Sequence, residues 1–274
     1  MSHIRLSTPR TALVTGVGEG IGFEVARRLA DGRTTVLVHA PSTACGEHAV
    51  SRLVAQGADP GRLRLFVADF ASFGQVVAMA TEVASAHPRL DLLVNNAATA
   101  GAATRTTTPD GHELTFQINY LAPYLLTRLL WESLTRSGHS RVVNVSSNLH
   151  RSGRLRWGDF TSAARYNATA AYAQSKLALT VFTRTLAEQA QGRLSAVSVH
   201  PGVVRGGLMR LYAPIGVPVA DGAENVLNLC DTSTPVDHGG YYDQRAPARA
   251  HPLVYDHRVA LRLWRISARL TTLD

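Results

Sequence analysis

The chain has 274 residues, of which 45% are hydrophobic and 18% are charged. This composition excludes a disordered or fibrous chain and predicts one globular domain over residues 1–274. The formal net charge is +8, but the arginines are spread along the sequence without a basic block that alternates with aromatic residues. We therefore expect no nucleic-acid partner.

Membrane spans, disulfides and metal sites are not expected either. No stretch approaches the ~20 apolar residues that cross a bilayer, and the first residues reach a glycine turn before any long apolar run. Cys45 and Cys230 are far apart, and the eleven histidines show no paired ligand spacing. The sequence thus predicts a cytoplasmic protein with two free thiols and no metal.

The apolar periodicity predicts strands that alternate with helices. In chain order, strands are expected at 11–15, 34–39, 62–69, 91–96, 141–145 and 194–200, and helices near 20–31, 43–57, 72–86, 112–134 and 168–191. Almost continuously apolar strands in such an order indicate a parallel sheet covered on both faces. With right-handed crossovers, the fold class is α/β, a single Rossmann-type doubly wound parallel sheet with helices on both faces.

The segment from about 252 to 270 is predicted to form a C-terminal amphipathic helix. One stripe is apolar and the other basic, with Val259, Leu263, Ile266 and Leu270 on the first and Arg258, Arg262, Arg265 and Arg269 on the second. Such helices usually pack on their own domain with the basic face in solvent, which is our expectation here. Contact with a membrane surface or a partner subunit is the alternative.

A glycine-rich turn, Thr15-Gly16-Val17-Gly18-Glu19-Gly20-Ile21-Gly22, lies between the first strand and the first helix. Glycine permits a tight turn and lets a pyrophosphate approach the backbone, where the N–H groups of a helix N-terminus bind it. By itself such a turn is a weak signal. Its place after the first strand of a βαβ series predicts a dinucleotide site.

Tyr172 and Lys176 lie four residues apart and therefore share one helix face. A free tyrosine has a pKa of ~10, and a nearby cation lowers it, which makes proton exchange with an alcohol feasible. Lys176 is also the only lysine in the chain. Ser146 and Ser147 end a predicted strand, where ligands of open sheets bind, and either hydroxyl could contact a substrate oxygen.

Together these motifs resemble the short-chain dehydrogenase/reductase family. The resemblance includes TGVGEGIG, Asp69, NNAA at 95–98, Asn119, Ser147, Tyr172-x-x-x-Lys176 and His200-Pro201-Gly202, in the family's order. The spacing from Ser147 to Tyr172, with SSNLHRSG and SVHPG, is most similar to the branch of retinol dehydrogenase-like enzymes.

The resemblance implies an NAD(P)(H)-dependent oxidoreductase that transfers hydride between nicotinamide and a carbonyl or alcohol. Tyr172 would be the acid or base, Lys176 would bind the nicotinamide ribose and lower the Tyr172 pKa, and Ser147 would orient the substrate oxygen. Asn119 would hold the water of a proton relay. The dinucleotide would be contacted by Gly16, Gly18, Gly20, Ile21, His39, Asp69, Phe70, Asn95, Ala97, Lys176, Pro201 and Val203. A homodimer or homotetramer built on the long helices is also implied.

Some positions depart from the family pattern. Ala98 replaces the glycine of NNAG, and Gly206 stands where a hydroxyl residue usually contacts the carboxamide. The end of the second strand, His39-Ala40-Pro41, carries neither the acid typical of NAD enzymes nor the arginine typical of NADP enzymes. Glu19 opposes an extra phosphate, whereas similar sequences with HAR at this strand end indicate NADP, so NADP(H) is favoured over NAD(H) by a small margin.

The substrate is expected to be a small lipophilic or polycyclic molecule. Loop 203–219 would cover it, because its leucines, Met209 and Tyr212 suit an apolar ligand, while Arg205 and Arg210 would suit an acidic group. His150 is expected either to touch substrate or to lie in solvent. Two other functions stay open: a non-redox cyclase, dehydratase or epimerase on this scaffold, and a dinucleotide-sensing binding protein.

Overall fold

A computed structural model of the chain describes residues 10–30, 33–205 and 216–273. Within them, eight strands form one sheet in the order β3-β2-β1-β4-β5-β6-β7-β8. The strands are β1 (Arg10–Val14), β2 (Thr34–Ala40), β3 (Leu63–Val67), β4 (Leu92–Asn95), β5 (Ser140–Val145), β6 (Leu194–His200), β7 (Tyr241–Asp243) and β8 (Ala246–Ala248). All neighbouring pairs are parallel except β7 and β8, which confirms the predicted Rossmann-type α/β fold.

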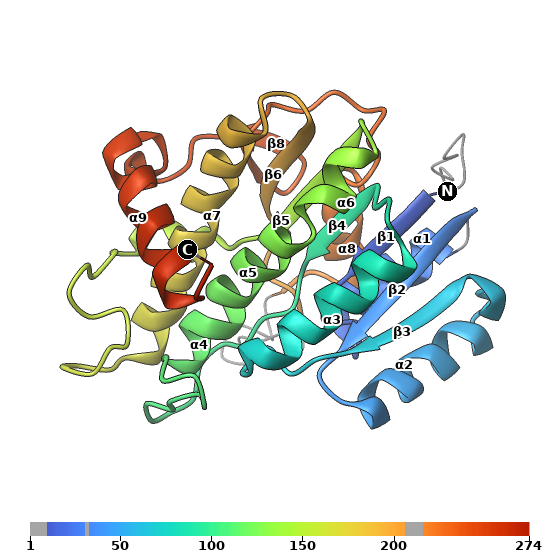
Figure 1. The fold of residues 1–274 in the computed structure, drawn as a ribbon, viewed down its shortest axis with the longest axis horizontal. Helices are drawn as coiled ribbons and strands as arrows, with labels where there is room; N and C mark the ends of the chain where they lie inside the picture. The colour runs from blue at the N-terminus through green and yellow to red at the C-terminus, as the bar shows by residue number, and fades with distance from the viewer. Residues whose placement is uncertain (1–9, 31–32, 206–215, 274) are drawn as a thin grey trace.

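Helices cover both faces of the sheet (Figure 1). They are α1 (Gly20–Ala30), α2 (Thr43–Ala55), α3 (Phe73–Ala86), α4 (Leu114–Phe116), α5 (Ala122–Leu129), α6 (Trp131–Arg136), α7 (Ala168–Ala190), α8 (Val219–Leu227) and α9 (His257–Leu270). One apolar cluster joins the sheet to α1, α2 and α8, and the other joins it to α3, α5, α7 and α9. Successive strand residues such as Leu92 and Leu93 enter opposite clusters, as the alternation of side chains in a strand requires.

The predicted helix over 112–134 is wrong as one continuous element. It is divided into α4, a π-helical turn over Gln117–Leu121, α5 and α6. Pro123 has no N–H to return to the carbonyl of Asn119 four residues earlier, so the regular α-helical bond there cannot form. The amide of Ala122 instead bonds the carbonyl of Gln117, and Asn119 lies inside this turn.

Three short elements were not predicted, and the C-terminal helix is shorter than expected. These elements are α8, β7 and β8, of which the two strands have only three residues each. Pro252–Tyr255 form a 3-10 turn, and α9 starts after Asp256, whose carboxylate accepts from the amides of Arg258 and Val259. This carboxylate satisfies N–H groups that the first helical turn leaves without partners.

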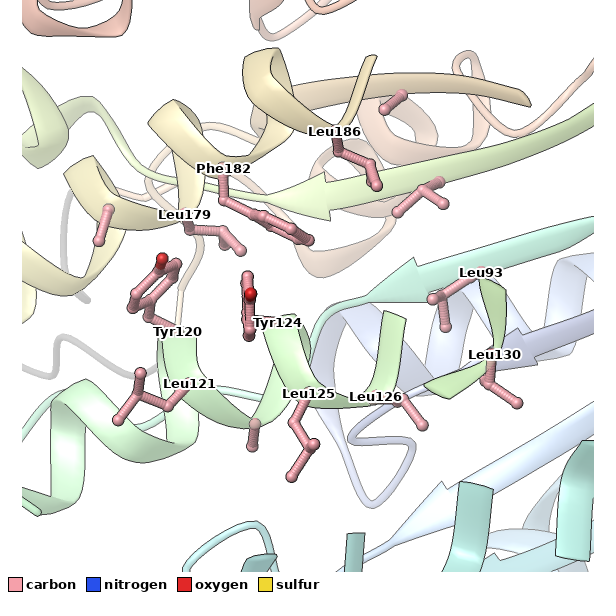
Figure 2. Close-up of a cluster of buried hydrophobic side chains, with 14 of the residues drawn as sticks. Leu93, Tyr120, Leu121, Tyr124, Leu125, Leu126, Leu130, Leu179, Phe182 and Leu186 are labelled. Atoms are coloured by element: carbon pink, nitrogen blue, oxygen red, sulfur yellow. The ribbon is translucent and has the colours of Figure 1, made fainter. Parts of the chain in front are cut away.

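The apolar face of α9 packs on α5 and α7. The Trp264 ring lies 5.5 Å from that of Tyr124 and 6.0 Å from that of Phe182, and Ser267 shares a hydrogen bond with Tyr120. Figure 2 shows Tyr120, Tyr124 and Phe182 facing one another between the two helices. The expectation that this helix packs on its own domain is therefore confirmed, and its apolar stripe is used inside the molecule.

We predict that Phe182→Ala lowers the free energy of unfolding by about 3–5 kcal/mol, because it removes a buried ring that contacts aromatic side chains from the π-helical turn, α5 and α9. Denaturant titration followed by circular dichroism measures the change. Val77→Ala, at a side chain that is 42% exposed, is the control and should cost less than about 1 kcal/mol. Equal losses in the two variants would contradict this view of the core.

Candidate active site and dinucleotide turn

The glycine turn follows β1 at the edge where the parallel strands end. Gly16 has a φ of +72°, and a β-carbon there would lie 2.8 Å from the Cα atom of Ala97. At Gly22 a β-carbon would lie 2.4 Å from the side-chain nitrogen of Asn96. Gly20 also has a positive φ, of +64°, but faces open space at the start of α1. Only glycine fits at positions 16 and 22, because a side chain there would collide with Ala97 or Asn96. Gly20 leaves the N-terminus of α1 open.

Thr15 and Asn96 hold this turn against the end of β4. The Thr15 hydroxyl accepts from the backbone amides of Asn96 and Ala97, both at 2.9 Å. The Asn96 side chain donates in return to the carbonyls of Thr15, at 2.9 Å, and Gly16, at 3.2 Å. Our sequence reasoning did not assign Thr15 or Asn96 to the site, although both stand inside the quoted motifs.

His39 supports the glycine turn, because both of its ring nitrogens form hydrogen bonds with the protein backbone. The Gly16 amide donates to its Nδ1 atom at 3.1 Å, so Nε2 carries the proton and donates to the Ala68 carbonyl at 2.9 Å. The ring is 2% exposed and stacks on Phe70 with centroids 4.3 Å apart. Burial lowers the pKa of His39 to about 4, so the imidazole is neutral at physiological pH. Its predicted contact with a dinucleotide therefore cannot use a ring nitrogen.

The other expected dinucleotide residues lie along the same edge but differ in exposure. Asp69 is partly exposed, and its carboxylate accepts from the Ala71 amide at 2.9 Å. Asn95 is buried, and its side-chain nitrogen donates to Asn144 at 2.8 Å and Thr127 at 3.1 Å. Its side-chain oxygen has no hydrogen-bond partner among the described residues. Asn95 thus belongs to a polar network inside the sheet.

Ile21 and Pro201 lie next to α8, and Val203 follows β6. Ile21 is partly exposed and lies near Gly222 of α8, where an added β-carbon would be 3.3 Å from its Cδ1 atom. The carbonyl of buried Pro201 accepts from the Asn225 side chain at 3.0 Å. Val203 is 45% exposed. The predicted positions Gly206, Met209, Arg210 and Tyr212 lie outside the described residues, as does most of loop 203–219.

Of the two serines after β5, only Ser147 is available to a ligand. Ser146 is buried and shares a hydrogen bond of 2.8 Å with Thr180 of α7. Ser147 is partly exposed, accepts from the Leu149 amide at 3.3 Å and caps the following 3-10 turn. Hydrogen bonding to its side chain lowers the pKa of Tyr172, although by less than burial raises it. The structure thus brings the predicted serine and tyrosine together.

Lys176 lies one helical turn after Tyr172 on α7, and both side chains are buried. The Lys176 Nζ atom donates to the Val145 carbonyl at 2.8 Å and lies 5.6 Å from the centre of the Tyr172 ring. Burial raises the pKa of Tyr172 to about 12 and lowers that of Lys176 to about 7. We expected the cation to lower the Tyr172 pKa. In this structure the loss of solvation is the larger effect, and it favours the neutral form of each group.

Asn119 positions the loop that faces this pair. Its side-chain nitrogen donates to the Thr99 carbonyl at 2.9 Å and to the Ser175 hydroxyl at 3.0 Å, and its oxygen accepts from the Thr99 amide at 2.7 Å. Ser175 in turn donates to the Tyr172 carbonyl at 2.7 Å. Asn119 is therefore connected to α7 next to Tyr172, as its expected place in the site requires.

His150 is neither a solvated loop residue nor a substrate contact. It is fully buried beside Tyr241, with ring centroids 4.4 Å apart. The His251 amide donates to Nε2 at 3.2 Å, so Nδ1 carries the proton and donates to the Ser147 carbonyl at 2.7 Å. Burial lowers the pKa of His150 to about 4. Both alternatives considered from the sequence are wrong, because the ring is used to hold Ser147.

The structure shows no metal site in the part of the chain that it describes. In this part, no three His, Cys, Asp or Glu side chains lie close enough together to hold a metal ion. None of the helices in those ranges has both the length and the apolar composition to cross a membrane. The two cysteines there are free thiols.

The arrangement fits a dinucleotide and an acid–base reaction. The helix N-terminus of α1 is open, has no acidic residue in its first turn, and can receive a pyrophosphate. Ser147 follows the end of β5, and Tyr172 and Lys176 lie in the first half of α7, where Lys176 is bonded to the last residue of that strand. A ligand across this edge would meet the turn and the phenol together.

Known proteins are similar to this chain in sequence. The family model described as short chain dehydrogenase matches residues 10–212. Retinol dehydrogenase 14 of Mus musculus is 33% identical, over 94% of this chain and 84% of that protein. Retinol dehydrogenase 12 of Homo sapiens is also 33% identical, over 95% of this chain and 86% of that protein.

Solved structures of other proteins have a similar fold. A crystal structure of a protein from Mycobacterium paratuberculosis has a TM-score of 0.81 and 28% identity, covering 96% of this chain and 93% of that one. A metagenomic short-chain oxidoreductase in complex with NADP has a TM-score of 0.63 and 25% identity, covering 83% of this chain and 94% of that one.

We predict that the neutral state of His39 makes folding pH-dependent. Its folded pKa, about 4, is below the ordinary value of 6.5, so the unfolded chain binds the proton more readily. The stabilisation is complete above pH 6.5 and is lost as the pH falls toward 4, by about 3 kcal/mol at most. Chemical denaturation at several pH values measures this slope.

His39→Asn should reduce that slope, because an amide does not titrate in this range. The matched control is His48→Asn, at an exposed position of α2. This control should keep the slope of the parent protein. An unchanged slope in His39→Asn would show that other groups cause the acid sensitivity.

Proposed function

Because this chain belongs to the short-chain dehydrogenase/reductase family, in its retinol dehydrogenase-like branch, we propose that it reduces a lipophilic carbonyl compound with a nicotinamide dinucleotide and Tyr172 as the acid. The family makes it an NAD(P)-dependent oxidoreductase. The observation that supports the assignment of the acid is the place of Tyr172 on α7, one helical turn from Lys176, whose Nζ atom lies 5.6 Å from the centre of the phenol ring.

Each side chain has a separate task in this proposal. The bound nicotinamide supplies the hydride in reduction and accepts it in oxidation. Ser147 donates a hydrogen bond to the substrate oxygen, and Tyr172 donates its proton to that oxygen as the carbon–hydrogen bond forms. A phenol with a raised pKa holds this proton at neutral pH, which suits the reductive direction.

Lys176 and Asn119 would return the proton to Tyr172. One N–H of Lys176 is used by Val145, which leaves two for ribose hydroxyls. The Asn119 side chain is already bonded to Thr99 and Ser175, so the relay water would bind its backbone carbonyl. Pro123 supports this role, because it cannot donate to that carbonyl.

The turn residues would hold the two phosphates, with Gly16, Gly18, Gly20 and Ile21 next to them. Asp69 and Ala97 would face the adenosine half, while Pro201 and Val203 would flank the nicotinamide. His39, Phe70 and Asn95 would act behind this surface, because their side chains are buried. The exposed Val203 side chain and the names of the retinol dehydrogenase relatives support a lipophilic substrate.

We predict that Tyr172→Phe lowers the turnover rate by about 10²–10⁴-fold while dinucleotide binding is retained, because only the transferable proton is removed. Loss of NADPH absorbance is followed with retinal, other aldehydes, ketones and quinones. Tyr255→Phe removes a phenol that is 49% exposed and bonded to the Ala250 amide, and it should keep full activity.

The same assay distinguishes the other functions. Product that forms without net consumption of NADPH would replace the redox proposal with a cyclase, dehydratase or epimerase. Dinucleotide binding with no product from any compound would favour a sensor. A fully active Tyr172→Phe enzyme would contradict the role of the phenol.

NADP(H) is the proposed dinucleotide, and Arg52 is the proposed contact for its extra phosphate. The Arg52 guanidinium stacks 4.1 Å from the Phe23 ring and donates to the Gly18 carbonyl at 3.3 Å, so a cation lies at the turn. Strand β2 ends at Ala40, and Pro41 and Ser42 follow it. None of these residues has an acidic side chain that would repel the phosphate. The solved relative in complex with NADP supports this choice.

We predict that Arg52→Gln weakens NADPH binding about tenfold and NADH binding by less than about twofold, because one charge-assisted phosphate contact is lost. Quenching of tryptophan fluorescence measures both constants. Arg62→Gln, at a partly exposed arginine after α2, should change neither. Equal losses for the two dinucleotides would show that Arg52 only supports the turn, and tighter NADH binding by the parent protein would reverse the proposed preference.

A homodimer or homotetramer remains a prediction. Helix α9 lies over α5 and α7 in this chain, so the faces of those helices that contact α9 are not open to a second subunit. Cytoplasmic localisation likewise remains a prediction.

A further inference from the structure

The outer face of α9 carries a straight row of four exposed arginines. At 100° per residue, Arg258, Arg262, Arg265 and Arg269 fall within about 60° of one another around the helix axis. A rise of 1.5 Å per residue spaces them over roughly 16 Å. The opposite face is already packed on α5 and α7, so the row points away from the core.

Within the described residues these arginines have no carboxylate partners. None of the ion pairs found in residues 10–30, 33–205 and 216–273 includes any of the four. Arg262 stacks on Trp157 with its guanidinium carbon 4.4 Å from the ring centre, which leaves its N–H groups at the edge. The nearby Asp159 is occupied by the Thr161 hydroxyl and by the amides of Ala163 and Ala164.

A groove of about 970 Å³ runs beside the row, between α9 and the segment that contains Trp157 and Phe160. The four arginines border it, and Trp157, Phe160, Ile266 and Leu270 supply apolar lining. The surface therefore combines a line of cations with an adjoining apolar groove. Anionic amphiphiles have both matching parts.

We propose that α9 docks the protein on the surface of a bilayer that contains anionic phospholipids. Guanidinium groups bind phosphate oxygens through paired N–H donors, and four basic residues on an amphipathic helix are typical of binding to anionic headgroups. The row is straight and presents all four charges along one side, as a flat charged surface requires. The groove would receive the apolar part of a lipid next to its headgroup.

This occupant fits better than a second copy of the chain. Two copies that meet through this face would bring eight uncompensated guanidinium groups together, and each chain carries a formal net charge of +8. The proposal also differs from membrane insertion of the helix, because Leu263 is buried in the core and Val259, Ile266 and Leu270 pack partly against it. Docking is therefore electrostatic and should be sensitive to salt.

The experiment is cosedimentation of the full-length protein with phosphatidylcholine vesicles, with and without phosphatidylglycerol. Each basic residue near an anionic surface contributes about 1 kcal/mol, or about fivefold in partitioning. The combined variant Arg258→Gln, Arg262→Gln, Arg265→Gln and Arg269→Gln should bind the anionic vesicles at least about a hundredfold less tightly. Glutamine keeps a long polar side chain with good helix propensity.

The matched control removes four exposed arginines elsewhere: Arg33, Arg64, Arg89 and Arg136, each to Gln. It has the same net charge as the α9 variant and should keep most of the binding. Thermal unfolding of both variants verifies that they fold.

Several results would overturn the proposal. Failure of the parent protein to bind anionic vesicles is one, and equally good binding to zwitterionic vesicles is another. Equal losses of vesicle binding in the two variants would indicate a general charge effect. Retention on a soluble acidic polymer without binding to vesicles would assign the row to an acidic macromolecule instead. Self-association that the α9 substitutions abolish, without vesicle binding, would assign it to a second copy.

Discussion

The Thr15 hydroxyl holds together the two backbone segments on which the candidate site is built. Parallel strands end at one edge of the sheet, and the backbone groups beyond them lose their ladder partners. Thr15 supplies an acceptor to the amides of Asn96 and Ala97, while Asn96 returns hydrogen bonds to the carbonyls of Thr15 and Gly16. This exchange fixes the glycine turn relative to β4, and the remaining parts of the site are placed along the same edge.

Burial, more than charge, controls the titratable groups at that edge. His39 and His150 are neutral because each ring is enclosed and uses one nitrogen as an acceptor and the other as a donor. The Tyr172 phenol and the Lys176 amine are shifted toward their uncharged forms for the same reason. Groups enclosed in this way stay uncharged, so a polar ligand that changed their local solvation would also change their protonation.

The sequence predicted the parts of the structure that follow from repeating patterns. Strand β6 occupies 194–200 as expected, because its apolar run is bounded by turn residues on both sides. The break around Asn119 was not predicted, since amphipathic spacing continues through a π-helical turn and only Pro123 signals the interruption. Strand β7 is too short to produce a period.

Single-residue contacts were harder to predict than the motifs that contain them. The motifs tie Ser147 to a strand end and Tyr172 and Lys176 to one helix face, and the structure has Ser147 after β5 and the other two on one turn of α7. The direction of the Tyr172 pKa shift was wrong, since solvent exclusion depends on the packed molecule. His39 was expected to contact a dinucleotide, and His150 either to touch substrate or to lie in solvent, but both rings are buried and bonded to the amides of Gly16 and His251.

The contact between His150 and His251 has a consequence for the order in which the protein is completed. The 3-10 turn after β5 accepts a hydrogen bond from His251, which leaves the ribosome about a hundred residues later, and α9 then covers α5 and α7. Such contacts between distant parts of a chain form late in folding. A nascent chain that already contains Ser147, Tyr172 and Lys176 therefore still lacks the His251 amide that holds His150 against Ser147. The candidate site is complete only when residues beyond 250 have been synthesised.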